Sequence, residues 1–335
     1  GVTVKILTGD SAEVAGAVAK SIGLLKDEEN VMTGAAFEAL KQDERLEAAR
    51  THHVFARVSP EQKHAVIQAL EQQYEVGFLG EGINDAPALK AANVGIVVQG
   101  ASDVAREAAD VVLLQQSLEV IVSGIREGRE VFANTLKYIK ATLASNFGNF
   151  YAVAISSFLI PSLPMLPIQI LLLNLLSDFP MIAIATDTVD AQELHRPRSY
   201  QVRDIITFAT ALGLTSTLFD FLFFGLFYRL EPAVLQTNWF IGSILTELIF
   251  VYSIRTHLPF WRASRPSWIL TALTSVAAGV TIFLPYSKFG QDLLHFQAPS
   301  TAHLILILSI VAVYFGATET VKLGYQRYVL RQASP

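Results

Sequence analysis

The apolar and polar residues of this 335-residue chain follow two different patterns. Up to about residue 134, short apolar runs alternate with mixed, charged segments, whereas from about residue 138 apolar blocks of roughly 20 residues follow one another. An apolar helix of about 20 residues is long enough to cross the hydrocarbon core of a bilayer. The pattern therefore predicts a soluble domain followed by a membrane domain.

The first part reads as strands that alternate with helices. The expected strands cover residues 2–7, 54–56, 76–79, 94–98 and 111–114, and the clearest helices cover 11–22 and 60–73. Thr8-Gly9-Asp10 reads as a turn that caps the first helix, and Gly23 is a typical helix end. Ser59-Pro60-Glu61-Gln62 opens the second helix, with Pro60 in its first turn. This order predicts a parallel, doubly wound α/β sheet that binds its ligands at the carboxyl ends of its strands.

The second part contains six segments with the length of membrane spans, at about 137–160, 164–186, 205–228, 236–254, 266–286 and 302–322. The alternative, core helices of a large soluble protein, is disfavoured because several blocks are nearly uncharged. Residues 118–136 read as one amphipathic helix that leads to the first span without a linker. The predicted organisation is thus a soluble domain at 1–117, a stalk helix at 118–136 and an all-α membrane domain of six helices at 137–335.

The distribution of positive charge predicts how the spans are oriented. If the first span begins in the cytoplasm, only Arg229 and Lys288 lie outside. The residues then placed inside are Lys137, Lys140, Arg196, Arg198, Arg203, Arg255, Arg262, Arg265, Lys322, Arg327 and Arg331. Both ends of the chain are therefore expected on the cytoplasmic side.

Composition narrows the function further. A net charge of −5 without a Lys/Arg cluster argues against nucleic acid as a partner. The absence of cysteine excludes disulfides and thiolate metal sites, which fits a cytoplasm-facing soluble part. The chain starts at Gly1, directly before an expected strand, and shows no start methionine or signal peptide, so we expect a fragment of a longer protein.

Three polar motifs follow the expected strands of the soluble part: Thr8-Gly9-Asp10, Lys63 after Ser59-Pro60-Glu61-Gln62, and Gly80-Glu81-Gly82-Ile83-Asn84-Asp85-Ala86-Pro87. Glycines let backbone amides approach an anionic group, and the acidic side chains beside them supply hard oxygen ligands for Mg²⁺. Each motif also has a simpler interpretation, respectively a helix cap, a solvated helix lysine and an ordinary turn. Their order along one chain favours a phosphate-handling site.

Polar residues also occur inside two expected spans, where they are costly and mark a pathway or a helix contact. Asn146 and Asn149 are three residues apart, and Asn174 and Asp178 are four apart, so each pair lies on one face of its helix. Together they offer three amide oxygens and a carboxylate, ligands suited to Mg²⁺ or Ca²⁺. Pro180 would interrupt its helix nearby and release carbonyl oxygens. For either asparagine of the first pair, a hydrogen bond between helices is the alternative role.

Three further carboxylates belong to the same part of the chain. Glu247 lies in the fourth span and is a candidate ligand or proton carrier, although it could equally snorkel or pair with a neighbour. Asp187 and Asp190 follow the second span and are expected to be entrance or exit charges.

With these motifs located, the chain resembles the P-type ATPases, and within them the bacterial magnesium-transporting branch. The resemblance rests on Leu7-Thr8-Gly9-Asp10, Phe55-Ala56-Arg57-Val58-Ser59-Pro60-Glu61-Gln62-Lys63, Gly80 to Leu89, Ser145-Asn146-Phe147-Gly148-Asn149 and Asn174-Leu175-Leu176-Ser177-Asp178-Phe179-Pro180. It implies the second half of a haloacid-dehalogenase-like phosphorylation domain, followed by the last six of ten membrane helices.

The resemblance also implies parts that this chain does not contain. Family members use ATP to phosphorylate an aspartate in an Asp-Lys-Thr-Gly-Thr sequence, which is absent here. That aspartate, the nucleotide-binding and actuator domains and four membrane helices are then expected upstream, as partners within the same polypeptide. The chain alone is expected not to hydrolyse ATP.

Individual roles follow from the resemblance. Lys63 is expected to pair with phosphoryl oxygens, and Thr8, Gly9 and Asp10 to lie beside the phosphorylation site. Asn84 and Asp85 are expected to hold phosphate and Mg²⁺, with Gly80 and Gly82 allowing close backbone approach. Glu81 stands where the family usually has an aspartate that coordinates the catalytic Mg²⁺. Its extra methylene requires the backbone to retreat slightly, and a weakened or inactive pump is the alternative to full activity.

The function expected from the sequence is a pump in the bacterial plasma membrane that couples aspartyl phosphorylation to the movement of a divalent cation. Calcium pumps carry an acidic residue at the position of Asn149, so the lower charge here favours a hydrated Mg²⁺, with import as the direction that the resemblance implies. The alternatives are a Ca²⁺ or proton pump of the same class and a membrane-anchored haloacid-dehalogenase-like phosphatase. Polar residues within the spans count against the anchored phosphatase, which needs no such groups.

Overall fold

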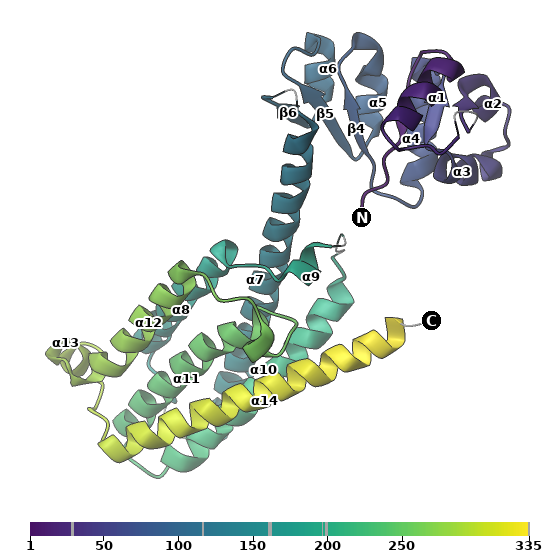
Figure 1. Ribbon diagram of the computed structural model, residues 1–335. Helices are drawn as coiled ribbons and strands as arrows, with labels where there is room; N and C mark the ends of the chain where they lie inside the picture. The colour runs from purple at the N-terminus through teal and green to yellow at the C-terminus, as the bar shows by residue number, and fades with distance from the viewer. Residues whose placement is uncertain (28–29, 116, 160–162, 196, 198–199, 334–335) are drawn as a thin grey trace. The chain divides into compact units, whose positions relative to one another are not determined.

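The computed structural model describes residues 1–27, 30–115, 117–159, 163–195, 197 and 200–333 (Figure 1). The chain divides into two compact units, Gly1–Gly124 and Ile125–Pro335. Helix α7 (Leu118–Leu159) begins in the first unit and continues into the second as one helix. The expected stalk helix and the described part of the first expected span are therefore segments of a single helix.

The first unit alternates strands with helices, as the sequence predicts, and all its strand pairs are parallel. Its elements are β1 (Ile6–Leu7), α1 (Ala12–Ser21), β2 (Met32–Thr33), α2 (Gly34–Glu38), α3 (Gln42–Thr51), β3 (Val54–Ala56), α4 (Pro60–Glu71), β4 (Gly77–Gly80), η1 (Ile83–Asp85), α5 (Ala86–Ala91), β5 (Val94–Val98), α6 (Asp103–Ala108) and β6 (Val111–Leu113).

The described strands form two sheets rather than the single sheet expected from the sequence. Their orders are β1-β3-β2 and β4-β5-β6, with Ile6 opposite Val54 and Gly77 opposite Val94. Strands β1 and β4 therefore each have one neighbour, and no strand within the described ranges bridges them. The expected strand at 2–7 is also shorter, because only its last two residues pair with β3.

Local sequence signals explain where the predicted helices begin and end. Ser11 caps α1, accepting from the Val14 N–H at 3.4 Å, and Gly23 follows the helix with a φ of 75°. Ser59 and Gln62 form a capping box at α4: each side chain accepts a hydrogen bond from the other residue's backbone N–H, at 3.2 and 3.0 Å. These two helices place the motifs that follow β1 and β3.

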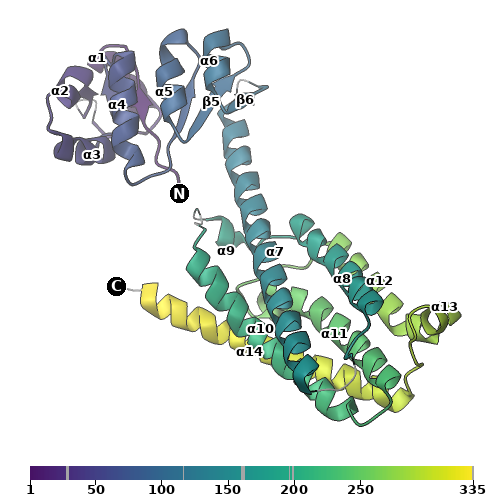
Figure 2. The same cartoon turned by 180° about the vertical axis from the view of Figure 1, so that it is seen from behind.

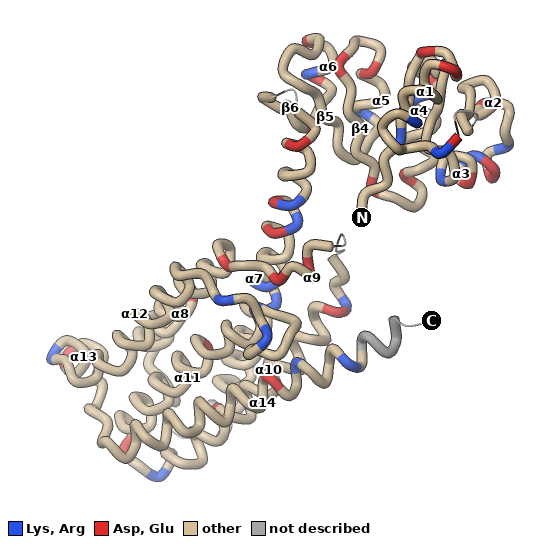
Figure 3. Tube along the Cα trace, viewed as in Figure 1, with Lys and Arg blue, Asp and Glu red and all other residues tan. Residues whose placement is uncertain are grey.

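The second unit is helical. Beyond α7 it contains α8 (Pro167–Ile182), η2 (Ala183–Thr186), α9 (Ala191–Leu194), α10 (Val202–Phe227), α11 (Pro232–Ile254), η3 (Phe260–Arg262), α12 (Trp268–Phe283), η4 (Leu284–Tyr286), α13 (Lys288–Asp292) and α14 (Thr301–Ala333). Figure 2 shows the same helices from behind, and Figure 3 shows how few charged residues lie along α8, α10, α11 and α12.

Among the described residues, five helical segments are long and apolar enough to cross a membrane: Pro167–Thr186, Val202–Phe227, Pro232–Ile254, Trp268–Tyr286 and Thr301–Tyr328. They correspond to the last five of the six expected spans. The first expected span, at 137–160, is not among them. Its residues up to 159 belong to α7, and Asn146 and Asn149 make this part of α7 less apolar than the five segments. Residue 160, and Arg196 and Arg198 of the predicted orientation, lie outside the described residues.

Helix α11 forms the centre of the second unit. It packs against α8, α10, α12 and α14, and 89% of its most apolar stretch is buried, against 28–44% for the other four candidate spans. Its side chains Trp239, Phe240 and Ile244 belong to the main apolar core, together with Phe223 and Phe224 of α10. A polar side chain on α11 is therefore enclosed by protein on most sides.

Candidate functional site

The Thr8-Gly9-Asp10 motif forms a turn at the carboxyl end of β1. The Thr8 hydroxyl donates to the Asp10 carboxylate at 2.7 Å and accepts from the Asp10 N–H at 3.2 Å. The chain after β3 closes over this turn, since the Arg57 and Val58 N–H groups donate to the carbonyls of Asp10 and Thr8 at 2.9 and 3.1 Å. Arg57 has a φ of 52°, which is uncommon outside glycine. The turn is therefore fixed to the segment that leads into α4.

Lys63 on α4 and Asp85 at the end of η1 meet in a partly buried ion pair. Nζ lies 2.7 Å from Oδ1, and the two side chains are 16% and 14% exposed. The other carboxylate oxygen, Oδ2, accepts from the N–H groups of Glu81 and Gly82, both at 3.2 Å. Burial raises the pKa of Asp85, but the hydrogen bonds from Lys63, Gly82 and Glu81 outweigh it, so the pKa is lowered overall. Two of the predicted site residues are thus brought together.

The glycines of the third motif contribute unequally. A Cβ on Gly80 would lie 2.7 Å from the Asp85 Cβ, so this close approach requires glycine, whereas one on Gly82 would meet only an ordinary contact at 3.6 Å. The sequence predicts backbone amides that approach an anionic group; in the structure, the N–H groups of Glu81 and Gly82 donate to the Asp85 carboxylate. Glu81 and Asn84 are exposed. Because both Asp85 oxygens already accept hydrogen bonds, Glu81 is the carboxylate of this motif that best suits Mg²⁺.

In the second unit, one carboxylate organises the polar residues of two helices. Oε1 of Glu247, on α11, accepts hydrogen bonds from Asn149 Nδ2 at 2.6 Å and from Ser145 Oγ at 2.8 Å, both on α7. Glu247 is 5% exposed, and its Oε2 is buried without a hydrogen-bond partner among the described residues. Of the roles considered for Glu247, pairing with a neighbour is confirmed, and an unbonded oxygen is left beside the pair.

The other predicted membrane ligands are not buried as Glu247 is. Asn146, Asn174 and Asp178 are exposed in the described chain, although Asp178 interacts electrostatically with Glu247. Among the described residues no group of three or more His, Cys, Asp or Glu is placed to hold a metal. Ser145 was not predicted as a site residue, but its position four residues before Asn149 places it on the same helix face.

Asp187 and Asp190, expected as entrance or exit charges, lie instead in a buried network. The Arg255 guanidinium donates to both Asp187 oxygens, at 2.7 and 3.2 Å, and these side chains are 3% and 0% exposed. Asp190 accepts from the Thr256 hydroxyl and the Ser264 N–H. Burial raises the pKa of Asp190, but these hydrogen bonds outweigh it and lower the pKa. The carboxylates therefore bind the segment after α8 to the segment after α11.

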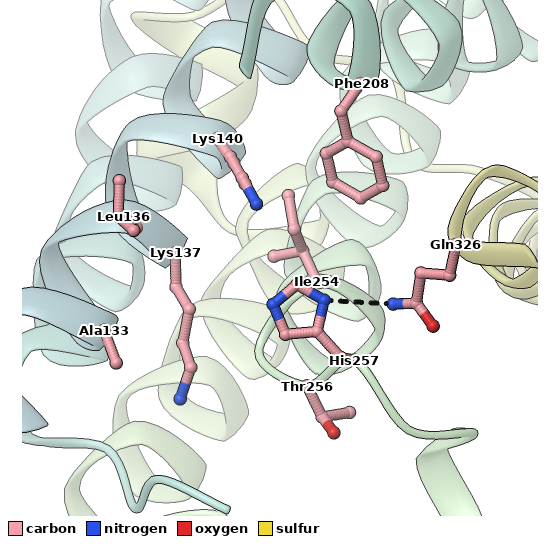
Figure 4. A pocket seen from close by; sticks show the side chains of 9 residues that line it. All are labelled: Ala133, Leu136, Lys137, Lys140, Phe208, Ile254, Thr256, His257 and Gln326. Atoms are coloured by element: carbon pink, nitrogen blue, oxygen red, sulfur yellow. Dashed lines mark hydrogen bonds between the residues drawn. The ribbon is translucent and has the colours of Figure 1, made fainter. Parts of the chain in front are cut away.

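A small cavity lies between α7, α10, α11 and α14 (Figure 4). Lys137 and Lys140 line it, and His257 Nδ1 lies 3.2 Å from Gln326 Nε2 across it. The cavity contains none of the predicted cation ligands. Two lysines at one cavity disfavour a divalent cation there, so the candidate cation site remains beside Glu247.

Comparisons with known proteins agree with the order of these two units. A family described as haloacid dehalogenase-like hydrolase matches residues 1–93, and one described as cation transporting ATPase, C-terminus, matches residues 162–324. The chain belongs to the P-type ATPases.

Among its relatives are magnesium-transporting ATPases. The magnesium-transporting ATPase, P-type 1, of Escherichia coli (strain K12) is 41% identical over 335 residues, covering 98% of this chain and 37% of the relative. The protein of that name in Salmonella typhimurium (strain 14028s) is 40% identical over 336 residues, with the same coverage. The calcium-transporting ATPase of Bacillus subtilis is 30% identical over 328 residues, covering 93% of this chain and 36% of the relative. The chain thus spans little more than a third of these relatives, in their C-terminal part.

Proposed function

We propose that this chain is the C-terminal part of a pump that couples ATP hydrolysis, through an aspartyl phosphate, to import of Mg²⁺ across the bacterial plasma membrane. The observation that carries the proposal is Glu247, a buried carboxylate on the central helix α11. One of its oxygens is bonded to α7, and the other has no hydrogen-bond partner within the part of the chain that the structure describes. A buried carboxylate without a cation is costly in a membrane domain. A transported cation would compensate it.

The first unit supports the phosphorylation step. Strands β1 and β4 each lie at a sheet edge, and the Thr8-Gly9-Asp10 and Gly80-to-Asp85 motifs follow these two strands. A parallel strand from upstream would pair with both edges, and its carboxyl end would then lie between Asp10 and Asp85. An aspartate there would be the phosphoryl acceptor, with Lys63 neutralising charge on the transferred group.

The catalytic Mg²⁺ fits this motif through Glu81. That carboxylate is exposed beside the motif, whereas Asp85 accepts hydrogen bonds at both of its oxygens and positions Lys63. When bound, Mg²⁺ neutralises charge on the phosphoryl oxygens. ATP would be supplied by the nucleotide-binding domain upstream in the same polypeptide, so the chain alone is expected to be inactive.

The membrane domain is proposed to be completed by upstream helices. Asn146, Asn174 and Asp178 lie in helices proposed to span the membrane, yet they are exposed in this chain. Polar side chains at that depth face protein or a water-filled path rather than lipid. Upstream helices packed here would enclose these three residues with Asn149 and Glu247, and would make α7 the first of six spans.

The choice of Mg²⁺ follows from the ligands. The proposed set contains two carboxylates, Asp178 and Glu247, among amide oxygens, so part of the cation's shell is left to water, which Mg²⁺ retains more readily than Ca²⁺. The name of the Escherichia coli relative, which says that it transports magnesium, supports the same cargo. The calcium-transporting relative makes Ca²⁺ the cargo to test against it.

The test is ATP-dependent uptake by the full-length protein in liposomes, with Mg²⁺, Ca²⁺ and protons followed separately. Uptake of Mg²⁺ that Asp178→Asn abolishes, and that the exposed-site control Asp292→Asn retains, would support the proposal. Because Mg²⁺ is also the partner of ATP, uptake rather than hydrolysis decides the cargo. Uptake of Ca²⁺ alone would show that Ca²⁺ rather than Mg²⁺ is the transported ion. Phosphatase activity without any ion movement would favour a membrane-anchored phosphatase.

A further inference from the structure

Helix α10 carries a carboxylate that the proposed cation site does not use. Asp220 is 3% exposed, at a place where α10 packs against α11 and α14. Its Oδ1 accepts a hydrogen bond from the indole N–H of Trp239 at 2.8 Å. Its Oδ2 is buried and has no hydrogen-bond partner among the described residues. The carboxyl group is therefore enclosed within the helix bundle with half of its bonding capacity unused.

The surroundings of Asp220 are aromatic. Phe223 and Phe224 follow it by three and four residues and so share its face of α10. Its donor Trp239 packs against Phe224 with the ring centroids 4.4 Å apart, and Tyr314 interacts with Asp220 electrostatically. An ionised carboxylate in such surroundings requires a cation or several hydrogen bonds to offset its lost hydration. Among the described residues, Asp220 has one hydrogen-bond donor, the neutral indole of Trp239. The neutral acid, with a proton on Oδ2, is the form that these neighbours accommodate.

The same surroundings select a proton rather than a metal ion as the ligand. Mg²⁺ and Ca²⁺ require about six or more oxygen ligands, whereas the indole of Trp239, which donates to Asp220, and the ring of Phe224 packed against it offer none. Within the described ranges, no group of three or more His, Cys, Asp or Glu could hold a metal. A proton needs one oxygen only.

Two titratable groups on the neighbouring helices face Asp220. Glu247 on α11 and Tyr314 on α14 both interact with it electrostatically, and Tyr314 also interacts with Glu247. An ionised Glu247 would repel an ionised Asp220. A cation bound beside Glu247 would cancel this repulsion and make loss of the Asp220 proton easier, and by reciprocity a protonated Asp220 would favour release of the cation.

We propose that Asp220 is a proton-binding site of the membrane domain that exchanges its proton in step with cation binding near Glu247. On release, the Oδ2–H bond breaks, the electron pair stays on the carboxylate and the proton passes to water. The protonation of Asp220 stands on its own surroundings, whereas the coupling rests on the proposed function. One proton would then move for each cation that occupies the site.

Infrared difference spectroscopy of the full-length transporter in membranes, with and without Mg²⁺, tests the proposal. The carbonyl stretching band of one protonated carboxyl is expected to disappear when Mg²⁺ binds. Asp220→Asn should lack this band from the start, and Asp292→Asn, altered at an exposed carboxylate, should retain it. A band that persists in Asp220→Asn would overturn the assignment.

Trp239→Phe provides a second test that does not depend on the folding of Asp220→Asn. It removes the hydrogen bond to Oδ1, so the carbonyl band should move to higher frequency and remain present. An unmoved band would show that the protonated group lies elsewhere. If the unmodified transporter moves no cation, the proposed function fails, but the band and its shift in Trp239→Phe still decide whether Asp220 carries a proton.

Discussion

Replacing Lys63 by methionine should weaken the first unit locally and in a pH-dependent way. The change keeps the length of the side chain but removes the ammonium group that lies 2.7 Å from the Asp85 carboxylate. Asp85 is largely buried, so its charge would keep only the two backbone N–H groups of Glu81 and Gly82. Loss of one partner of a buried polar pair costs about 1–3 kcal/mol. We expect a loss of that size in the free energy of local unfolding around Asp85.

Hydrogen exchange of the amides in α4, β4 and η1, measured on the full chain in lipid nanodiscs, can detect this change. A cost of about 1–3 kcal/mol corresponds to roughly 5- to 150-fold faster exchange. Lys90→Met removes an exposed lysine from the neighbouring helix α5 and serves as the matched control. Exchange in that variant should stay close to that of the unmodified chain.

The pH dependence follows from the lowered pKa of Asp85 in the folded state. A lowered carboxylate pKa stabilises the fold above the pKa of the unfolded chain, and this contribution is lost as pH falls through the folded pKa. The difference between the parent chain and Lys63→Met should therefore be full near neutral pH and shrink in acid, where Asp85 is protonated in both. Equal exchange in the two proteins at pH 7, or a difference that does not change with pH, would refute this account of the ion pair.

Two further substitutions test the helix packing of the second unit. A Cβ on Gly213 would lie 3.0 Å from the Phe147 Cβ, so Gly213→Ala should lower the free energy of unfolding, measured in detergent, by about 1–3 kcal/mol. Gly225→Ala on the same helix places its Cβ in open space and should leave the stability unchanged. Equal effects of the two substitutions would contradict the close contact at Gly213. Arg255→Leu leaves the buried Asp187 carboxylate without its guanidinium partner and should lower the free energy of unfolding by about 3–5 kcal/mol in the same assay. A loss below about 1 kcal/mol would show that solvent reaches the pair.

The sequence predicts the local structure of the first unit well where capping and turn signals are strong. Ser59 marks the start of α4 and Gly23 the end of α1, as the sequence predicts, whereas Ser11 rather than the Thr8-Gly9-Asp10 turn caps the start of α1. Strand pairing is different, because it depends on partners far along the chain. Within the described ranges β1 and β4 each pair with one strand only, and no local sequence pattern predicts this split into two sheets.

The candidate sites of both units also combine features that the sequence predicts with pairings that only the fold shows. Lys63 and Asp85 were predicted as site residues from their motifs, but their bond to each other joins positions 22 residues apart. The bond between Asn149 and Glu247 joins positions 98 residues apart. Charge alone did not show whether Asp187 and Asp190 are open to solvent, and the partners that bury them lie beyond α10 and α11. Residue types thus indicated the candidate residues, whereas the pairs that these residues form required the fold.

The central claim is that the cation binds beside Glu247, and Mg²⁺ uptake by the Glu247→Gln transporter tests it most directly. Full-length protein in liposomes would be assayed over a range of Mg²⁺ concentrations, with aspartyl phosphorylation measured in the same samples and Asp292→Asn as the control. Loss of the charge that Asn149 and Ser145 hold in place should raise the half-saturating Mg²⁺ concentration by about 10- to 100-fold while phosphorylation persists. Unchanged uptake in Glu247→Gln would contradict a cation site at this position.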